Sequence, residues 1–217
     1  MTVPQDSQDE EYFKLCVNRV RTEYLVWVEQ FLDIIQEADI LRDSHHLTLN
    51  DIGCNVGQFW KGLKRRQLKV DYKGYDIETR YLKAAKEIFP EISDAFLELD
   101  IVKEKPRTAD VSVASAVLEH FKALSPGLNN ILESTNKLLI LRTFLGDTSD
   151  QSIFLKKGAK TFYYINQYQY REILELLDDY GFSTSIVRDK FTDSMPKYLG
   201  QGIVRSRYII IGKKGDE

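Results

Sequence analysis

The sequence has few cysteines and no long apolar run. Cys16 and Cys54 are the only cysteines in 217 residues, so a disulfide framework is excluded, and no C-x-x-C pair indicates zinc. Because no run reaches the roughly 18 apolar residues of a membrane span, we expect no membrane association. The first eleven residues are polar and acidic, unlike a signal peptide. These features predict a soluble protein of a reducing compartment, which we expect to be the cytoplasm.

The sequence also lacks an excess of basic residues. It has 30 Lys and Arg against 33 Asp and Glu, a net charge of −3. Nucleic-acid-binding proteins usually carry a basic face, so no nucleic-acid partner is expected. The run "KGLKRRQLK", Lys61 to Lys69, has helical spacing and is predicted to be a solvated helix face. The hydrophobic content of 43% is enough for one core, and we expect a single domain over residues 1–217.

Strand-like and helix-like patterns alternate along the chain. Strand-like runs occupy 47–52, 70–76, 95–99, 110–116, 137–144, 182–188 and 203–211. Helical patterns occupy 56–68, 79–88, 125–135 and 167–179. This alternation predicts a mostly parallel sheet with covering helices. The last two strand signals have no helix between them, which favours an antiparallel pair.

Three segments lie outside this alternating pattern. Residues 1–9 are expected to be a flexible tail. From Phe13 to Leu41 the apolar residues recur every three or four positions, which predicts one long amphipathic helix or two with a bend. We expect residues 10–43 to form a helical lid. The connection 145–170 is longer than usual and rich in aromatic residues, so we expect a substrate-side insertion there.

The stretch "LTLNDIGCNVGQFW" carries a glycine loop after a predicted strand. It is not a dinucleotide fingerprint, because Asn55 and Gln58 stand where G-x-G-x-x-G requires glycine, and it lacks the G-K-[ST] ending of a Walker A loop. The spacing is D-x-G-x-x-x-G, from Asp51 through Gly53 to Gly57. Neither a pyrophosphate nor a triphosphate is therefore the expected ligand.

Acidic residues end the next two strands. Asp76 follows Gly53 at about 20 residues, the distance at which an acid accepts hydrogen bonds from ribose hydroxyls in such sheets. Asp100 closes the third strand, where it is placed to meet an adenine amino group or a neighbouring loop. A glycine loop with a ribose acid and no phosphate-binding device suits an adenosine that carries something other than phosphate.

Five motifs in this order resemble those of the class I S-adenosylmethionine-dependent methyltransferases. They are "LNDIGCNVGQF", "YKGYDIE", "FLELDIV", "ADVSVASAVLEHF" and "NKLLILRTF", over roughly residues 47–145. The resemblance implies an α/β, Rossmann-like fold. Its sheet would have seven mostly parallel strands with the last antiparallel, helices on both faces and an N-terminal helical lid. It also implies S-adenosyl-L-methionine as cofactor and S-adenosyl-L-homocysteine as product.

The resemblance also implies the cofactor contacts. The loop from Gly53 to Phe59 would wrap the methionine part, Asp76 would bind the ribose, and Ile77 would lie against the adenine. The full set of expected contacts is Asp51, Gly53, Cys54, Asn55, Gly57, Gln58, Phe59, Asp76, Ile77, Asp100, Ile101, Ser115, Ala116 and Val117. A purely structural role is the alternative for two of them: Asp51 as a backbone cap and Cys54 as a small packed side chain.

Glu119 and His120 are the candidate catalytic residues, because "SAVLEHF" places them at the carboxyl end of the fourth strand. Histidine titrates near neutral pH, so His120 is suited to act as a base. Alternatively, Glu119 caps a helix start and His120 only packs. Some similar methyltransferases bind a metal through E-x-x-E-H, but Ala116 replaces the first glutamate, so no metal is expected. His45 and His46 are neighbours that would point to opposite faces, which argues against a shared ligand.

Substrate contacts are expected from the N-terminal helix, the insertion and the segment "FTDSMPKYLGQG". One or more of four side chains of that helix would face the pocket: Arg19, Arg21, Tyr24 or Trp27. The selected substrate residues are Tyr24, Arg142, Tyr163 and Tyr164. The first hypothesis is methyl transfer to a small molecule or glycan, with oxygen as the favoured acceptor. An RNA or protein methyltransferase and a catalytically silent binding module are the alternatives.

Overall fold

The protein is described by a computed structural model that covers residues 10–38, 47–155 and 162–215. The histidine pair His45 and His46 and the predicted tail 1–9 lie outside the described residues. In the described part of the chain, no helix is both long and apolar enough to cross a membrane.

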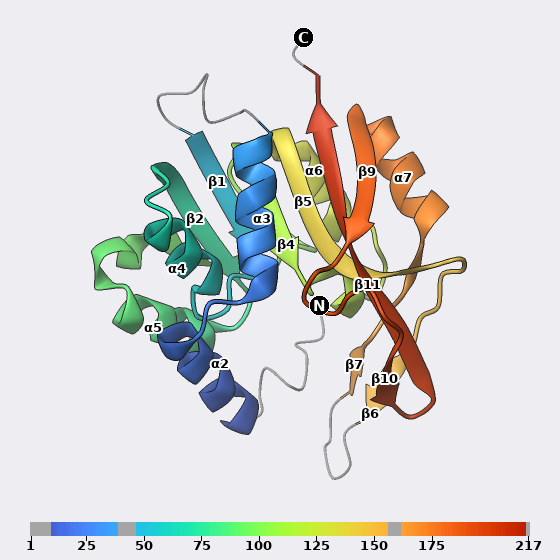
Figure 1. Cartoon of the computed structure of the whole chain (residues 1–217), viewed down its shortest axis with the longest axis horizontal. Coiled ribbons are helices and arrows are strands. Elements are labelled where there is room, and N and C mark those ends of the chain that lie inside the picture. Colours follow the sequence, from blue (N-terminus) through green and yellow to red (C-terminus); the bar gives the residue numbers. More distant parts are fainter. Residues whose placement is uncertain (1–9, 39–46, 156–161, 216–217) are drawn as a thin grey trace.

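A mixed, mostly parallel sheet forms the centre of the molecule (Figure 1). Its strands follow the order β10-β11-β5-β4-β1-β2-β3, with β9 paired to β11 and β8 to β5. The bounds are β1 Leu47–Ile52, β2 Val70–Asp76, β3 Phe96–Glu98, β4 Ala109–Ser115, β5 Thr135–Gly146, β8 Tyr168–Gln169, β9 Phe182–Arg188, β10 Lys197–Gly200 and β11 Ile203–Lys214. All seven predicted strands are present, and two short strands that were not predicted, β8 and β10, bring the sheet to nine strands. β11 is antiparallel to β5 and β9, which confirms the predicted antiparallel last strand.

Helices cover both faces of the sheet, as predicted (Figure 1). Helices α3 (Val26–Glu37), α4 (Gln58–Arg65) and α5 (Thr79–Ile88) pack on one face. Helices α6 (Gly127–Glu133) and α7 (Tyr170–Asp179) pack on the other. Since successive side chains of a strand point to opposite faces, Leu138 and Ile140 of β5 join the first core, and Leu139 and Leu141 join the second.

The N-terminal region forms two helices with a bend, the second of the two predicted arrangements. Helix α2 (Glu10–Thr22) lies near the carboxyl ends of the strands, and α3 begins after a short break. Most of α3 packs in the core, because Phe31, Leu32 and Ile35 are completely buried against the sheet. Helix α2 and the start of α3, at Trp27, line the cavity at the strand ends.

The insertion after β5 contains strands that the sequence did not predict. β6 (Ile153–Leu155) and β7 (Phe162–Tyr164) pair as a separate antiparallel sheet that projects beyond the strand ends (Figure 1). A small apolar cluster joins this hairpin to β10 and β11; it consists of Phe144, Phe154, Tyr163, Ile165, Leu199 and Ile203. Two short 3-10 turns complete the described elements, η1 (Pro90–Ala95) and η2 (Leu118–His120).

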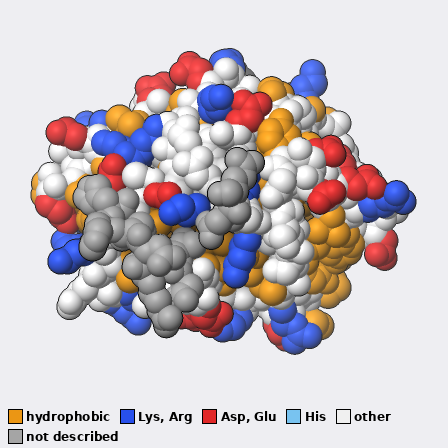
Figure 2. All heavy atoms as spheres, turned by 90° about the horizontal axis from the view of Figure 1, so that it is seen from above, with side chains coloured by type: hydrophobic (Ala, Val, Ile, Leu, Met, Phe, Trp, Pro, Cys, Tyr) orange, Lys and Arg blue, Asp and Glu red, His pale blue; other side chains and the backbone are white. Residues whose placement is uncertain are grey.

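The surface at the top of Figure 1, at the opposite end from the carboxyl ends of the parallel strands, carries charges of both signs. In Figure 2, Lys and Arg side chains are interspersed with Asp and Glu, and no continuous basic area appears among the described residues of this face. This distribution agrees with the small negative net charge.

Candidate active site

A cavity of about 420 Å³ opens at the carboxyl ends of β1, β2, β4 and β5. This volume lies within the usual range of ligand sites, and this edge of the sheet is where open α/β folds bind ligands. The wall includes most of the residues expected from the sequence: Asp51, Gly53, Cys54, Asn55, Gln58, Phe59, Asp76, Ile77, Ile101, Ser115, Ala116, Val117, His120, Arg142 and Tyr163.

The glycine loop forms one part of this wall. The backbone amides of Gly53 and Cys54 both donate to the carbonyl oxygen of Tyr75, at 2.7 and 2.9 Å, which fixes the loop to the end of β2. Gly53 has a φ of +72°, and a Cβ there would collide with the side chain of Val117. Glycine is therefore required by backbone conformation and by space, and its backbone lies open to the cavity.

Asp76 organises the same loop from the end of β2. Its Oδ2 accepts a hydrogen bond from the Asn55 amide at 2.8 Å, and its Oδ1 accepts one from the Glu78 amide at 2.9 Å. Each carboxylate oxygen has a further lone pair for a ligand hydroxyl. Burial raises the pKa of Asp76 to about 6, against the effect of the backbone hydrogen bonds.

Asp51 is the second carboxylate in this part of the wall. The hydroxyl of Tyr72 donates to its Oδ2 at 2.8 Å. Burial raises the pKa of Asp51 to about 7; the Tyr72 hydrogen bond opposes this shift, and the nearby charge of Asp76 adds to it. The cavity therefore presents two acids that change charge close to neutral pH.

Five residues expected at the site are not part of the cavity wall: Tyr24, Gly57, Asp100, Glu119 and Tyr164. Tyr24 is half exposed, and the cationic groups of Lys61 and Arg65 lie over its ring, each 4.3 Å from the ring centre. Because Tyr24 lies in the break between α2 and α3, the bend turns it away from the pocket.

Asp100 and Gly57 have structural roles, since each one supports a local backbone conformation. Asp100 accepts a hydrogen bond from the Val102 amide at 3.1 Å and pairs with Lys103 at 3.2 Å, so its carboxylate stabilises a turn. Its neighbours Leu99 and Ile101 line the cavity instead. Gly57 has a φ of +84° at the start of α4, and a Cβ there would meet the ring of Phe89 at 2.9 Å. Turn geometry and packing explain both residues.

His120 faces the cavity in a defined orientation. Its Nδ1 lies 2.8 Å from the carbonyl oxygen of Tyr164. A carbonyl oxygen only accepts hydrogen bonds, so in the neutral ring Nδ1 carries the proton and Nε2 keeps a lone pair. The ring also packs edge-on against Tyr163, with centroids 5.9 Å apart. The contribution of Tyr164 is thus its carbonyl group, while its side chain lies outside the wall.

Glu119 lies behind the cavity wall and is completely buried. Its Oε1 accepts a hydrogen bond from Nη2 of Arg207 at 2.7 Å, and its Oε2 accepts one from the Thr143 hydroxyl at 3.0 Å. Burial opposes ionisation, but the charge of Arg207 places the pKa of Glu119 below its ordinary value. Glu119 is therefore an ionised partner of Arg207 and does not meet a ligand directly.

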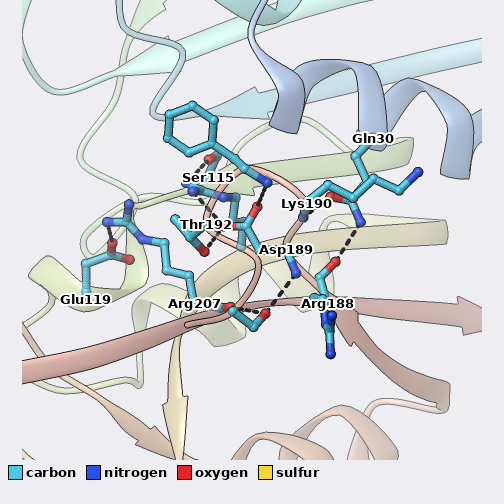
Figure 3. Close-up of polar contacts among 11 residues, drawn as sticks. Gln30, Ser115, Glu119, Arg188, Asp189, Lys190, Thr192 and Arg207 are labelled. Atoms are coloured by element: carbon cyan, nitrogen blue, oxygen red, sulfur yellow. Dashed lines mark hydrogen bonds and ion pairs between the residues drawn. The ribbon is translucent and has the colours of Figure 1, made fainter. Parts of the chain in front are cut away.

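A polar network links β5, α3 and the loop after β9 next to Arg142 of the cavity wall (Figure 3). Nη2 of Arg142 donates to Oδ2 of Asp189 at 2.9 Å, and both side chains are almost fully buried. Asp189 also accepts from the Thr192 hydroxyl at 2.6 Å. Gln30 of α3 donates to the carbonyl of Arg188 and accepts from the Lys190 amide, both at 2.8 Å. The loop after β9 is thereby held against the sheet and α3.

Several wall residues were not named individually from the sequence, although Tyr12, Cys16, Ile165, Phe191 and Leu199 lie in the segments expected to contact the substrate. The full set is Tyr12, Cys16, Leu25, Ile52, Tyr75, Glu78, Tyr81, Leu99, Phe144, Ile165, Phe191, Leu199 and Arg207. For Arg207 a signal exists, since arginine is unusual in a strand as apolar as "RYIII". Arg19 and Trp27, two of the four candidates from the N-terminal helix, do line the cavity. Among the described residues, no group of three His, Cys, Asp or Glu is placed to hold a metal ion.

Comparisons with known proteins identify the fold. No family model and no curated protein matches the sequence. Magnesium protoporphyrin IX methyltransferase (ChlM) from Synechocystis PCC 6803, solved with bound SAH, matches with a TM-score of 0.59 at 19% identity, over 87% of this chain and 82% of its own. An S-adenosylmethionine-dependent methyltransferase from Clostridium acetobutylicum ATCC 824 matches with a TM-score of 0.60 at 11% identity, over 91% and 94%.

A third structure, the DhpI-SAM-HEP complex, matches with a TM-score of 0.55 at 12% identity, over 96% of this chain and 97% of that chain. The likeness extends over nearly the whole length of both chains. The protein therefore has the fold of the class I S-adenosylmethionine-dependent methyltransferases, as the sequence motifs predicted.

Proposed function

We propose that the protein is an S-adenosylmethionine-dependent methyltransferase that methylates an oxygen atom of a small molecule or glycan. One observation carries the proposal: a single cavity extends from the glycine loop and Asp76 to the side of His120. The first part suits the cofactor and the second suits a base. The likeness to methyltransferases, one with bound SAH and one in a complex with SAM, supports the same cofactor here.

The residues of the cavity fit this cofactor. The free lone pairs of Asp76 would accept hydrogen bonds from the ribose hydroxyls. Ile77, Leu99 and Ile101 offer apolar surface to the adenine. The exposed backbone at Gly53 would approach the methionine part closely, since no side chain intervenes. When bound, the cofactor supplies an activated methyl group on a sulfonium.

His120 is the proposed general base. With the proton on Nδ1 held by the Tyr164 carbonyl, Nε2 is free to take a proton from the acceptor. A hydroxyl acceptor must lose that proton as the new bond to carbon forms, which is why a base favours oxygen. Methyl transfer also requires that the acceptor atom is held about 3–3.5 Å from the methyl group, and the residues that line the cavity would hold it there.

Two observations favour a small acceptor over RNA or protein. The cavity wall includes the aromatic side chains of Phe144, Tyr163 and Phe191, of which Tyr163 packs against His120, and such surfaces suit a ring or a sugar. The basic run on α4 is engaged within the protein: Lys64 pairs with Glu91 at 2.6 Å, and Arg66 pairs with Glu29 at 2.7 Å. For a silent binding module the space beside His120 would have no use.

The test is a transfer assay with S-adenosylmethionine labelled in its methyl group. The protein is incubated with a cell extract separated into small-molecule, RNA and protein fractions. We expect label in the small-molecule fraction, lowered by about 100-fold or more in His120→Gln, the usual scale of general-base catalysis. Label in RNA or protein would favour those alternatives, and no label in any fraction would favour the silent module.

A further inference from the structure

Guanidinium groups form one end of the cavity wall. Arg142 reaches it from β5 and Arg207 from β11. Their partner carboxylates, Asp189 and Glu119, are completely buried and are not part of the wall. Figure 3 shows Glu119 and Asp189 each joined to an arginine, on different sides of the network. A ligand at this end therefore meets cationic donors and no carboxylate.

These two arginines keep donor capacity that the described residues do not use. Each guanidinium carries five N–H donors. Arg142 donates Nη2 to Asp189 and Nη1 to the Ser115 hydroxyl at a long 3.4 Å, while its Nε is buried without an acceptor. Arg207 donates Nη2 to Glu119, and its Nε also lacks an acceptor within the described residues. Both Nε groups are enclosed by the protein, so the donors that a ligand in the cavity can reach are the terminal nitrogens. Nη1 of Arg207 has no acceptor among the described residues, and a ligand would supply one.

The Arg207 guanidinium is held in place and still accessible. It lies 4.3 Å above the ring of Phe144, and Glu119 binds it from behind. Its side chain keeps 23% of its surface exposed, against 0% for Glu119. A carboxylate that is fully buried behind a partly exposed arginine orients that arginine towards the cavity. Glu119 is thus a positioning residue.

The cavity is polarised along its length. The opposite end, around the glycine loop, exposes the carboxylates of Asp51, Asp76 and Glu78, and Arg19 of α2 is a third guanidinium of the wall. Those acids suit hydroxyl and ammonium donors, whereas the arginine end suits an anion. Guanidinium groups recognise planar carboxylates and phosphate-type groups through paired hydrogen bonds.

We propose that the methyl acceptor carries an oxyanion, a carboxylate or a phosphate-type group, that is bound by Arg207 together with Arg142. This inference rests on the proposed function and names the class of its substrate. His120 follows Glu119 in the chain and lines the same wall, so an acceptor anchored by its anion on Arg207 presents its hydroxyl next to Nε2.

The main rival is that the two arginines bind the carboxylate of the cofactor's own methionine part. The experiment therefore uses protein saturated with S-adenosylhomocysteine, in which that carboxylate is already present. The probes are inorganic phosphate, 3-hydroxybenzoate and the uncharged 3-hydroxybenzamide, titrated by calorimetry at constant ionic strength. We expect phosphate and 3-hydroxybenzoate to bind, and the amide to bind at least 10-fold more weakly than the acid.

Variants locate the anion. Arg207→Gln is expected to weaken 3-hydroxybenzoate binding at least 10-fold while S-adenosylhomocysteine binding changes less than twofold. Arg207→Gln leaves the charge of the buried Glu119 without its partner, which can destabilise the protein. The double variant Glu119→Gln/Arg207→Gln removes both charges and is expected to weaken 3-hydroxybenzoate binding to the same extent. Arg188→Gln is the matched control: it removes one positive charge at an exposed position outside the wall and should leave anion binding unchanged.

Three results would overturn the proposal: equal binding of the acid and the amide, displacement of S-adenosylhomocysteine by the anions, or unchanged anion binding in both Arg207 variants. Failure of the proposed function is distinguishable, because it would appear at the first step as no binding of S-adenosylhomocysteine to the native protein.

Discussion

Asp51 and Asp76 give the cavity a dependence on pH. Burial raises their pKa values to about 7 and about 6. We expect the affinity for S-adenosylhomocysteine to rise as the pH increases from 5 to 8, because only the ionised carboxylates accept all the hydrogen bonds that the ligand offers. Calorimetric titrations across this range measure it, and Asp51→Asn should flatten the upper part of the profile. An affinity independent of pH would contradict this role.

The raised pKa values of Asp51 and Asp76 also make the stability of the ligand-free protein depend on pH, in the opposite direction to the ligand affinity. A carboxyl group whose pKa is raised in the folded state contributes stability below its ordinary pKa and loses it as the pH rises through the folded value. The ligand-free protein therefore loses this contribution between about pH 4 and pH 7, the window in which ligand binding becomes stronger.

Gly53 combines a left-handed backbone conformation with close packing against the side chain of Val117. Gly53→Ala should lower the free energy of unfolding by about 2–4 kcal/mol, from left-handed strain plus overpacking against Val117. Gly181→Ala is the matched control, since Gly181 has a similar φ of +77° and nothing within 4 Å. It should cost about 1–2 kcal/mol. Denaturant unfolding measures both, and equal costs would contradict the contact with Val117.

At the level of elements, α2 and α3 have different roles. Helix α3 is part of the core, whereas α2 has few fully buried side chains and lines the cavity through Tyr12, Cys16 and Arg19. Near its start, α2 is attached to α5 by an ion pair between Glu10 and Arg80. The Arg80 guanidinium also lies 3.8 Å from the ring centre of Phe13 on α2.

Hydrogen exchange should separate these two helices. Amides of α2 are expected to exchange faster than those of α3, because local opening of α2 exposes little apolar surface. S-adenosylhomocysteine should slow exchange in α2, and α7 provides the control because it lies away from the cavity wall. Equal slowing of α2 and α7 would show that α2 does not cover the ligand.

The elements were predicted where a strong pattern existed. The seven predicted strands and the four helices predicted after the glycine loop were found within a few residues, because their apolar patterns are strong. The short strands β8 and β10 of the same sheet were missed. The strands of the insertion are two or three residues long and carry no measurable period. The direction of single side chains was also beyond the sequence: Asp76 ends β2 and Asp100 follows β3 two residues after its end, yet only Asp76 of these two faces the cavity. Arg207, from a strand remote in sequence, was missed.

At the scale of the whole molecule, the fold brings distant segments to one edge of the sheet. The glycine loop, β4, the insertion and β11 meet there, and their charges divide the cavity into an acidic part and an arginine part. Gln30 on α3, Arg142 on β5 and Asp189 after β9 join three further segments beside it (Figure 3). The fold, the glycine-loop end of the cavity and Arg142 were predicted from the sequence, while Arg207 is brought beside Arg142 by tertiary contacts.

The most direct test of the central claim is calorimetric titration of the protein with S-adenosylmethionine and S-adenosylhomocysteine, repeated on Asp76→Asn and Asp100→Asn. We predict that both ligands bind and that Asp76→Asn weakens binding by about 1.5–3 kcal/mol, the scale of hydrogen bonds to a charged group. Asp100→Asn should change it little, because the Asp100 carboxylate lies outside the wall. No binding to the folded native protein, or equal losses in both variants, would contradict the account.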